Sequence, residues 1–480
     1  MIETNIRKTG VMTNMKMLYM YDVRGIQDYI FRTNKMKEIV GASIIVDSLI
    51  MKLFEKATED YNVSYNMNAS DELKFKFDDT NELDAEILYY GGGNLLVLFN
   101  DHEIAEKVSK EMCFKLVKKT YTLQLAVAGV EATGDYHKDY LNLRQEMDRV
   151  KLNMPMSLPV SGFPITLNDP QTGFAFSKEF EGKKCTYEAY KKLKAFKKKY
   201  KDNEIEKIND FKSFEGESLI AIVHIDGNNM GQRIANIMGK ITDYKEATKK
   251  SREISEGINE WFINKALTHV ENKVEELCAK AGLKKSKAEA FRKIISAGDD
   301  ITFVCNARIA LSCVEEFMKS LGEEYTACAG VYVTHTHFPF SRAYEYSEQL
   351  CSNAKKLSRD NPGNYVDFHI NYGGILNDLE TIRETQYTVA GQSLVGRPYD
   401  LNNNIDELFG MLNEFKVRNI ARTKLKGLRE AFMEGPEVVE KELARINSRL
   451  KEELIIDKEK YSVLFDAIEV MDLKWGECHE

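Results

Sequence analysis

The sequence predicts an α+β protein with two ferredoxin-like palm domains and a C-terminal helical bundle. In each half of the chain, a buried strand ends in an acid, Asp22 or Asp226, and leads into a helix. In each half, two short apolar runs then flank a tight glycine turn, which is typical of a β-hairpin. The copies keep a nearly constant offset, because 204 residues separate Asp22 from Asp226 and 206 separate Gly92 from Gly298. The order of elements, β-α-α-β-turn-β-α-β, is that of a palm domain.

Length, charge and cysteine usage exclude several classes of protein. The chain has 480 residues, enough for about two to four domains with large cores. A formal net charge of −8 argues against a protein that grips nucleic acid over its whole surface. The 8 cysteines contain no C-x-x-C pair, which favours reduced thiols in the cytoplasm and predicts no zinc site. No apolar run reaches the ~18 residues of a membrane span, so no membrane attachment is expected.

Composition and periodicity divide the chain into four parts. These are a first palm over 16–155, a linker with a lysine-rich helical segment over 156–215, a second palm over 216–400 and a helical domain over 401–480. In the first palm, the patterns predict strands over 17–22, 87–90, 95–99 and 121–132, and helices over 25–31, 38–56, 101–119 and 136–153. We expect helices to cover one face of its antiparallel sheet.

The same hydrophobic patterns predict the helices and strands of the second palm and of the helical domain. In the second palm we expect a strand over 218–226, helices over 243–282 and 284–290, a hairpin over 294–304, a helix over 307–320 and strands over 325–334 and 365–369. In the helical domain we expect helices over 402–415, 416–434, 436–453 and 458–471. Gly410 and Gly435 are expected to interrupt these helices.

The linker contains two features of its own. Leu158–Pro164 is expected to mark a boundary, since it combines proline, serine and glycine. Residues 176–213 are rich in lysine, and apolar residues recur at spacings of three and four from Tyr187 to Tyr200. The lysines are interpreted as the solvated face of a helix. The alternative is a phosphate-binding patch for a nucleic acid or a partner surface.

The hairpin of the second palm carries the chemistry. Ala297-Gly298-Asp299-Asp300 places two adjacent acids at a turn, and the strand order brings Asp226 close to them. Three carboxylates in a small volume are suited to Mg²⁺ (or Mn²⁺), and we predict two ions that assist a phosphoryl displacement. Asp226, Asp299 and Asp300 are therefore the predicted catalytic and metal-binding residues. The alternatives are a solvated turn for the Asp pair and a helix N-cap for Asp226.

Residues near these acids are candidates for nucleotide binding. Backbone N–H groups of the turn after Asp226 can meet phosphates, which selects Gly227, Asn228, Asn229 and Gly231. Ser296 and Gly298 of the hairpin are expected to border the same nucleotide. Lys355 or Lys356 could reach the β- and γ-phosphates, although the two could also be a surface lysine pair. His335 and His337 share one strand face, but no third metal ligand accompanies them.

The first palm lacks two of the three acids. Its turn reads Gly91-Gly92-Gly93-Asn94, so only Asp22 remains of the three acids. It cannot build the same two-metal site, but its glycines let a nucleotide approach closely. A disarmed palm that faces an active one would form a composite pocket for two nucleotides.

These motifs, in this order, resemble the large polymerase-like subunit of type III CRISPR effector complexes, a double palm protein of the nucleotide cyclase (GGDEF-like) kind. The resemblance covers about residues 17–400, and it also rests on the segments Lys37–Ser43 and Phe338–Tyr344. It implies that the second palm joins and cyclises ATP into cyclic oligoadenylates when target RNA is bound. It also implies that Asp226, Asp299 and Asp300 hold Mg²⁺, that Ser43 and Gly91 to Asn94 line a second nucleotide site, and that the helical domain contacts another effector subunit.

The sequence departs from that family in three ways. The first palm starts almost at once, with no HD nuclease domain before it, and the cysteine pairs between the palms are missing. Ala297 replaces the first glycine of the Gly-Gly-Asp-Asp signature, for which we expect lowered or altered activity at most. These departures suggest a compact relative.

The sequence therefore supports a main hypothesis and two alternatives. The main one is a cytoplasmic Mg²⁺-dependent nucleotidyltransferase that uses ATP or other NTPs, in contact with effector subunits and guide or target RNA, or as a homodimer. The first alternative is a nucleotide-binding scaffold or sensor that docks other subunits through residues 402–480. The second is a diguanylate-cyclase-like enzyme, whose hairpin usually continues with Glu-Phe where this chain has Asp300-Ile301.

Overall fold

A computed structural model describes residues 15–66, 75, 82–155, 165–200, 219–371, 373 and 377–473. The chain divides into two compact units. Unit 1 comprises Met1–Ile205 with Asn229–Glu260, and unit 2 comprises Glu206–Asn228 with Trp261–Glu480. Each unit is described by itself. Leu158–Pro164, the predicted boundary, lies outside the described residues, as does the part of the lysine-rich segment beyond residue 200.

Unit 1 contains the first palm sheet. Its strands, in spatial order, are β2 (Tyr65–Asn66), β3 (Ala85–Gly91), β4 (Asn94–Phe99), β1 (Met17–Arg24) and β5 (Gln124–Glu131). All neighbours are antiparallel except β2 and β3. The order β3-β4-β1-β5 is the ferredoxin-like order that the sequence predicts.

Five helices belong to the first copy of the repeat. They are α1 (Ile26–Phe31), α2 (Met36–Val46), α3 (Leu49–Asp60), α4 (His102–Thr120) and α5 (Tyr136–Asn153). The prediction of one helix over 38–56 is wrong, because the chain breaks between α2 and α3 at Asp47 and Ser48. Asp and Ser both have a lower helix propensity than alanine or leucine, and the Ser48 side chain makes no capping hydrogen bond to α3.

Helices cover both faces of this sheet, so the prediction of one covered face is wrong. On one face, Tyr21 donates or accepts a hydrogen bond with Ser109 of α4 at 2.9 Å, and the ring of Phe99 lies 6.3 Å from that of Phe54 of α3. On the other face, Leu18 of β1 packs in a core with Leu143 of α5. The reason is that β1 is apolar on both sides, which is typical of a strand buried between two layers.

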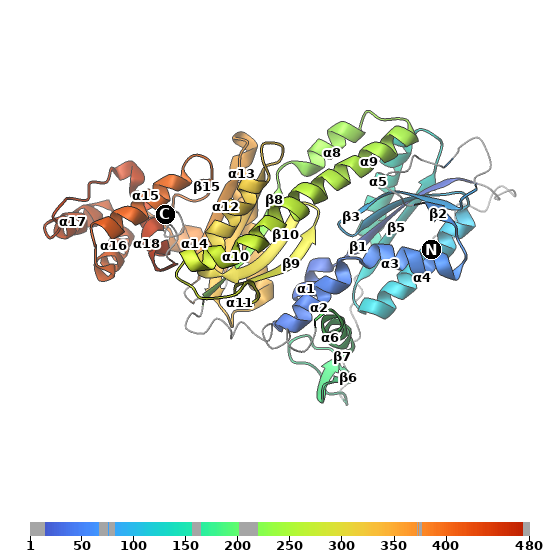
Figure 1. Ribbon diagram of the computed structural model, residues 1–480, viewed down its shortest axis with the longest axis horizontal. Coiled ribbons are helices and arrows are strands. Elements are labelled where there is room, and N and C mark those ends of the chain that lie inside the picture. Colours follow the sequence, from blue (N-terminus) through green and yellow to red (C-terminus); the bar gives the residue numbers. More distant parts are fainter. Residues whose placement is uncertain are drawn as a thin grey trace. The chain divides into compact units, whose positions relative to one another are not determined.

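The segment Asn229–Glu260, which follows the first strand of the second repeat, belongs to compact unit 1. Two helices, α8 (Met230–Met238) and α9 (Tyr244–Ile258), lie in this unit (Figure 1). The Tyr244 hydroxyl donates to Asp139 of α5 at 2.9 Å, and Arg252 donates to the Ile87 carbonyl at 2.5 Å. Arg252 also lies 3.8 Å from the buried Glu86 carboxylate. The compact units therefore divide the chain differently from a simple cut between two palms.

The lysine-rich segment forms a hairpin and a helix. The elements are β6 (Phe176–Phe180), β7 (Lys183–Thr186) and α6 (Tyr187–Lys199). Most lysines of α6 are exposed, as expected for a solvated face, but Lys192 is buried with 1% of its side chain exposed. Its ammonium pairs with Glu188 at 2.6 Å and donates to the Tyr29 carbonyl at 2.5 Å. Burial follows from the close approach of α2 and α6, since a β-carbon on Gly41 would lie 2.0 Å from the Lys192 carbonyl oxygen.

Unit 2 contains the second palm sheet. Its strands, in spatial order, are β15 (Tyr399–Asp400), β12 (Tyr365–Ile370), β11 (Ala327–His335), β8 (Leu219–Gly227), β10 (Asp300–Asn306) and β9 (Phe291–Ala297). The order β11-β8-β10-β9 repeats the arrangement of the first sheet, and β12 adds a parallel strand beside β11. The helices of this palm are α10 (Thr268–Lys280), which continues a π-helical segment over Asn259–Leu267, α11 (Lys287–Ala290), α12 (Ala310–Ser320), α13 (Phe340–Asp360) and α14 (Leu379–Gln386).

Helix α13 lies close against the second sheet. It contacts β8, β11 and β12, and α12 also reaches β8 and β11 (Figure 1). The closest approach is at Gly330 of β11, where a β-carbon would lie 2.0 Å from the Ser347 carbonyl oxygen and 2.5 Å from the Cys351 backbone nitrogen. Only glycine fits there without a backbone shift.

We therefore expect Gly330→Ala to destabilise unit 2. The added methyl group has to push α13 away from the sheet, which corresponds to a loss of about 1–3 kcal/mol in the free energy of unfolding. Differential scanning calorimetry of the full chain measures this loss. Gly410→Ala is the control, since its new methyl group meets open space on a helix and is expected to leave stability unchanged or raise it. Equal unfolding temperatures for the two variants would contradict the close approach.

The helical domain follows the second palm. Its main helices are α15 (Ile405–Val417), α16 (Arg422–Glu434), α17 (Pro436–Asn447) and α18 (Tyr461–Val470). Gly435 separates α16 from α17 with φ +119°, as predicted. The prediction of an interruption at Gly410 is wrong, because Gly410 lies inside α15. A single glycine weakens a helix by only about 1 kcal/mol relative to alanine, which packing of Leu408 and Met411 offsets.

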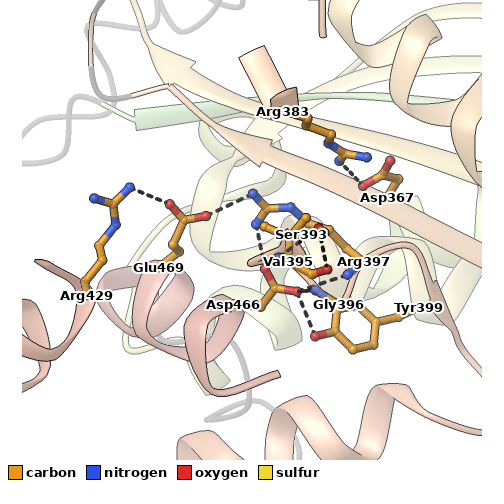
Figure 2. Close-up of polar contacts among 10 residues, drawn as sticks. All are labelled: Asp367, Arg383, Ser393, Val395, Gly396, Arg397, Tyr399, Arg429, Asp466 and Glu469. Atoms are coloured by element: carbon orange, nitrogen blue, oxygen red, sulfur yellow. Dashed lines mark hydrogen bonds and ion pairs between the residues drawn. The ribbon is translucent and has the colours of Figure 1, made fainter. Parts of the chain in front are cut away.

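A buried ion cluster joins α18 to the second palm (Figure 2). Arg397 precedes β15 and is completely buried between Asp466 and Glu469 of α18, at 3.1 Å and 2.9 Å. Tyr399 donates to Asp466 at 2.8 Å, and Arg429 of α16 contacts the other side of Glu469 at 2.9 Å. The domain is thus held by polar groups that must all find partners away from water.

The described part of the chain has no helix that is both long enough and apolar enough to cross a bilayer. Its seven cysteines are all free thiols.

Candidate metal and nucleotide site

The predicted acids meet where β8 ends and the β9–β10 hairpin turns. Ile225 of β8 lies opposite Ile301 of β10, so Asp226 and Asp300 are level in adjacent strands. Asp299 lies in the two-residue turn, beside Gly298, which has φ +67°. A glycine at the first turn position satisfies that backbone geometry and leaves Asp299 in an ordinary conformation. The strand register therefore places Asp226 beside Asp300, with Asp299 in the adjoining turn. Their joint role as a metal site stays a prediction.

Burial and the repulsion of neighbouring acids raise the pKa of Asp299 and of Asp300. Desolvation by burial, followed by the charge of Asp226, raises the pKa of Asp299 to about 6. Desolvation, then Asp226 and Asp299, raise the pKa of Asp300 to about 7, and Glu348 adds to the repulsion. The Asp300 side chain as a whole keeps 34% of its surface, yet its Oδ1 atom is buried and makes no hydrogen bond. An acceptor of this kind is a candidate for a cation.

Lys355 occupies one side of the acid cluster. Its ammonium, from α13, lies 2.6 Å from Asp226 Oδ2 and donates to the Gly227 carbonyl at 3.1 Å. The predicted contact of Lys355 with phosphates stays a prediction, but its position beside the acids fits that role. Lys356, the next residue, is exposed and is not placed among the acids.

His224 lies behind the hairpin and was not selected from the sequence. It precedes Asp226 by two residues on β8, so it shares a strand face with it. Its Nδ1 atom lies 3.1 Å from the Thr302 hydroxyl and 3.6 Å from Asp300 Oδ1. Burial lowers the pKa of His224 to about 4, so the ring is neutral at pH 7. A neutral ring adds no positive charge, and the acids still lack neutralisation from that side.

The donor set fits a divalent cation, although the metal-free arrangement is not a finished metal site. Among the described residues, no group of three or more His, Cys, Asp or Glu side chains is arranged to hold a metal ion. Three acids and one lysine leave two negative charges when all are ionised. An ion that approaches Asp300 Oδ1 would satisfy a buried acceptor and remove the repulsion that raises the two pKa values. Carboxylate oxygens are also the ligands that Mg²⁺ prefers.

The residues predicted to bind nucleotide in the turn after Asp226 lie in different settings. Gly227 is the last residue of β8, and the Asn228 side chain donates to Thr326 at 3.1 Å and to the Gly363 carbonyl at 2.9 Å. Both amide protons of Asn228 are thus used within the protein. Asn229 has φ +54° at the start of α8, and Gly231 is exposed in its first turn. The Asn228 backbone N–H also donates within the protein, to the Thr326 carbonyl at 2.9 Å. Nucleotide binding by these residues stays a prediction.

Ala297 is compatible with the hairpin. It is the last residue of β9 and pairs with Asp300, so its backbone is extended and needs no glycine. Gly298 alone carries the positive φ angle. Ser296 precedes Ala297 on the same strand, opposite Ile301. The substitution that distinguishes this hairpin therefore leaves the turn itself unchanged.

The first palm has the same hairpin register, with a different turn conformation and different chemistry. Asn94 lies opposite Asp22, so it takes the place of Asp300, and Gly93 takes that of Asp299. Gly92 and Gly93 both have positive φ, at +56° and +85°. Asp22 pairs with Lys151 of α5 at 2.5 Å, which leaves this acid neutralised.

Ser43 lies half-buried in α2, and Gly91 is half-buried at the end of β3. Their role in a second nucleotide site stays a prediction, as does the composite pocket. His335 and His337 also lie where no third ligand from the described residues joins them.

The sequence could have revealed Lys151, but His224 would have been difficult to select. Lys151 precedes Lys355 by 204 residues, the same offset as between Asp22 and Asp226. The repeat therefore indicated that Lys151 is the counterpart of Lys355. A histidine inside an apolar strand, in contrast, is usually a core residue, and nothing in the pattern marks His224 as different. Tyr344 contacts the edge of the His224 ring, with ring centroids 5.7 Å apart.

A family comparison identifies the second palm. Residues 219–362 match the family model described as Cas10/Cmr2, second palm domain. The matched range contains all three acids and Lys355. A comparison with curated proteins found no match.

Solved structures share the fold over nearly the whole chain. The Csm1–Csm4 cassette in complex with cA4 aligns with a TM-score of 0.56 and 12% identity, over 96% of this chain and 70% of that chain. The Csm1–Csm4 subcomplex of the type III-A CRISPR-Csm interference complex aligns with a TM-score of 0.56 and 14% identity, over 96% and 70%. The cassette with AMPPNP aligns with a TM-score of 0.54 and 14% identity, over 97% and 71%. The double palm with a helical C-terminal domain is therefore a known architecture.

Proposed function

We propose that this Cas10-like chain, whose residues 219–362 form a second palm domain of Cas10/Cmr2 type, is a nucleotidyltransferase that joins ATP into oligoadenylates and cyclises them. The products would serve as second messengers in CRISPR-linked antiviral defence. The observation that carries the proposal is the cluster of Asp226, Asp299 and Asp300, with a buried oxygen that has no hydrogen bond. Support comes from the solved Csm1–Csm4 structures, whose ligands include cA3, cA4, pppApApA and AMPPNP.

The chain's own residues have defined tasks in this proposal. Asp226, Asp299 and Asp300 would hold Mg²⁺ (or Mn²⁺), with two ions proposed. When bound, the metal would lower the pKa of the attacking ribose hydroxyl and neutralise the triphosphate. Lys355 would contact phosphate, and Gly227 and Gly298 would let the nucleotide approach the backbone. His224 supports the Asp300 side of the cluster as a neutral, buried ring.

The first palm would bind the second nucleotide without metal, through Ser43 and Gly91 to Asn94. Its single acid is already paired with Lys151, so it offers no free carboxylate to an ion. Effector subunits, guide or target RNA and a second copy of the chain are proposed partners, with the helical domain as a docking surface for a subunit.

The experiment is product analysis. The purified full chain is incubated with a mixture of NTPs and Mg²⁺ or Mn²⁺, with and without single-stranded RNA, and the products are identified by mass spectrometry. We expect adenylate oligomers, in linear and cyclic forms. Nucleotide binding without any product under all of these conditions would overturn the proposal.

The alternative function is a nucleotide-binding scaffold that docks other effector proteins. One observation favours it: the Lys355 ammonium lies 2.6 Å from the Asp226 carboxylate and supplies this acid with a counter-charge from the chain itself. Binding of ATP without turnover in the same experiment would select this alternative.

A further inference from the structure

Both palms place a lysine on the acid at the end of the first strand. Lys151 lies 2.5 Å from Asp22, and Lys355 lies 2.6 Å from Asp226. Both the two lysines and the two acids are 204 residues apart. Each lysine is also the 16th residue of its helix, since α5 begins at Tyr136 and α13 at Phe340. The ion pair is therefore a shared part of the two palms.

In the second palm, the ammonium takes the ligands that a metal ion would take. Lys355 contacts the Asp226 carboxylate and the adjacent Gly227 carbonyl, at 2.6 Å and 3.1 Å. A carboxylate oxygen and a backbone carbonyl oxygen are suitable ligands for a hard divalent cation. Only 24% of the Lys355 side chain is exposed, so the ammonium is held at the site and does not sample solvent freely.

The charges around the two pairs differ. In the first palm, Asp22 and Lys151 balance each other, because Asn94 and Gly93 replace the other acids. In the second palm, Asp299 and Asp300 add two acids that a single ammonium leaves without compensation. A divalent cation therefore has an electrostatic reason to enter the second palm and none to enter the first.

We propose that Lys355 is a displaceable internal counter-ion, which fills the cation position at Asp226 in the metal-free chain and leaves it when a divalent cation binds. The inference rests on the proposed metal site. Displacement frees the ammonium beside the same acids, where it can meet the anionic triphosphate. Lys151 remains in place, because no surplus of acid draws a cation to the first palm.

The test is Mn²⁺ binding to the full chain without nucleotide, measured by electron paramagnetic resonance of free Mn²⁺. Lys355→Met removes the competing charge, and we expect Mn²⁺ to bind about tenfold more tightly than to the unsubstituted chain. Lys355→Arg, which keeps the charge, is expected to retain the original affinity. Lys287→Met is the matched control, because it removes an ion pair of the same length, 2.6 Å to Glu271, outside the acid cluster.

Two results would overturn the inference. One is an unchanged or weaker Mn²⁺ affinity in Lys355→Met, including the absence of any binding. The other is an equal gain in Lys287→Met. Thermal unfolding of each variant shows that the compared chains are folded.

This readout is independent of turnover. If the unsubstituted chain makes oligoadenylates but Lys355→Met shows no gain in Mn²⁺ affinity, the counter-ion inference fails alone. If no products form but the gain is observed, the proposed function fails and the counter-ion inference stands.

Discussion

Replacing Arg397 with methionine is expected to lower the free energy of unfolding by about 3–5 kcal/mol, because Asp466 and Glu469 both lose a fully buried cationic partner. The Arg397 side chain is completely buried, and it is paired with both Asp466 and Glu469 (Figure 2). Even with Arg397 present, burial raises the pKa of Asp466 to about 6. Without the guanidinium, Asp466 keeps the neutral Tyr399 hydroxyl but loses its charged partner, while Glu469 keeps its contact with Arg429.

Calorimetry of the full chain measures this loss, and Arg445→Met is the matched control. Arg445 also pairs with an acid of the helical domain, Glu442, but 56% of its side chain is exposed. Removing an exposed pair is expected to change stability by less than about 1 kcal/mol. Adding Asp466→Asn to Arg397→Met should recover part of the loss, since one uncompensated charge disappears. A loss no larger than that of Arg445→Met would contradict this account of the cluster.

The second large effect is expected from Asp299→Asn combined with Asp300→Asn. Synthesis of oligoadenylates should fall to the limit of detection, because the amides cannot hold the metal with the same charge. The metal-free protein, in contrast, should gain stability at pH 8, by about 1–2 kcal/mol once solvent screening of the half-exposed side chains is taken into account. Product analysis by mass spectrometry and calorimetry measure the two effects. Full activity in the double variant would remove these acids from the mechanism.

The gain in stability should depend on pH. The pKa of Asp299 is raised to about 6 and that of Asp300 to about 7, above the usual value of 3.8 for both groups. A raised pKa in the folded state means that folding favours the protonated form. The stability that these two groups contribute is therefore fully present below about pH 4 and is lost as the pH rises from about 4 through the folded pKa values of about 6 and about 7. The difference in stability between the double variant and the unsubstituted chain should grow over that interval, and a constant difference would argue against the raised pKa values.

Much of the fold could be predicted from the sequence, because the signals were local and occurred twice. Strands that end in acids, glycine turns and helical spacing place the elements of both palms within a few residues. The break at Asp47 and Ser48 was missed, because the apolar spacing continues across it and only the low helix propensity of these two residue types marks it. The packing of α9 on the first palm was missed for a different reason. It depends on partners such as Asp139 and Ile87, more than 100 positions away, which no local pattern reports.

The acids of the site were predicted because strand pairing fixes which residues become level. The state of the site was harder to predict. Lys355 contacts Asp226 because α13 packs on the sheet, and this packing of distant segments is not visible in any local sequence pattern. His224 was missed because burial, which makes it neutral, cannot be distinguished by sequence from ordinary core placement.

The glycine turn of the first palm has a consequence for any attempt to place a carboxylate there. Gly93 stands where the second palm has Asp299, but its φ angle is +85°, and a β-carbon there would lie 2.9 Å from the Ile26 side chain. A residue with a side chain would be strained by this positive φ angle, whereas the δ-carbon of Ile26 is the end of a flexible side chain and can move aside. An aspartate at Gly93 would therefore cost stability through the backbone before it supplied a carboxylate to this turn.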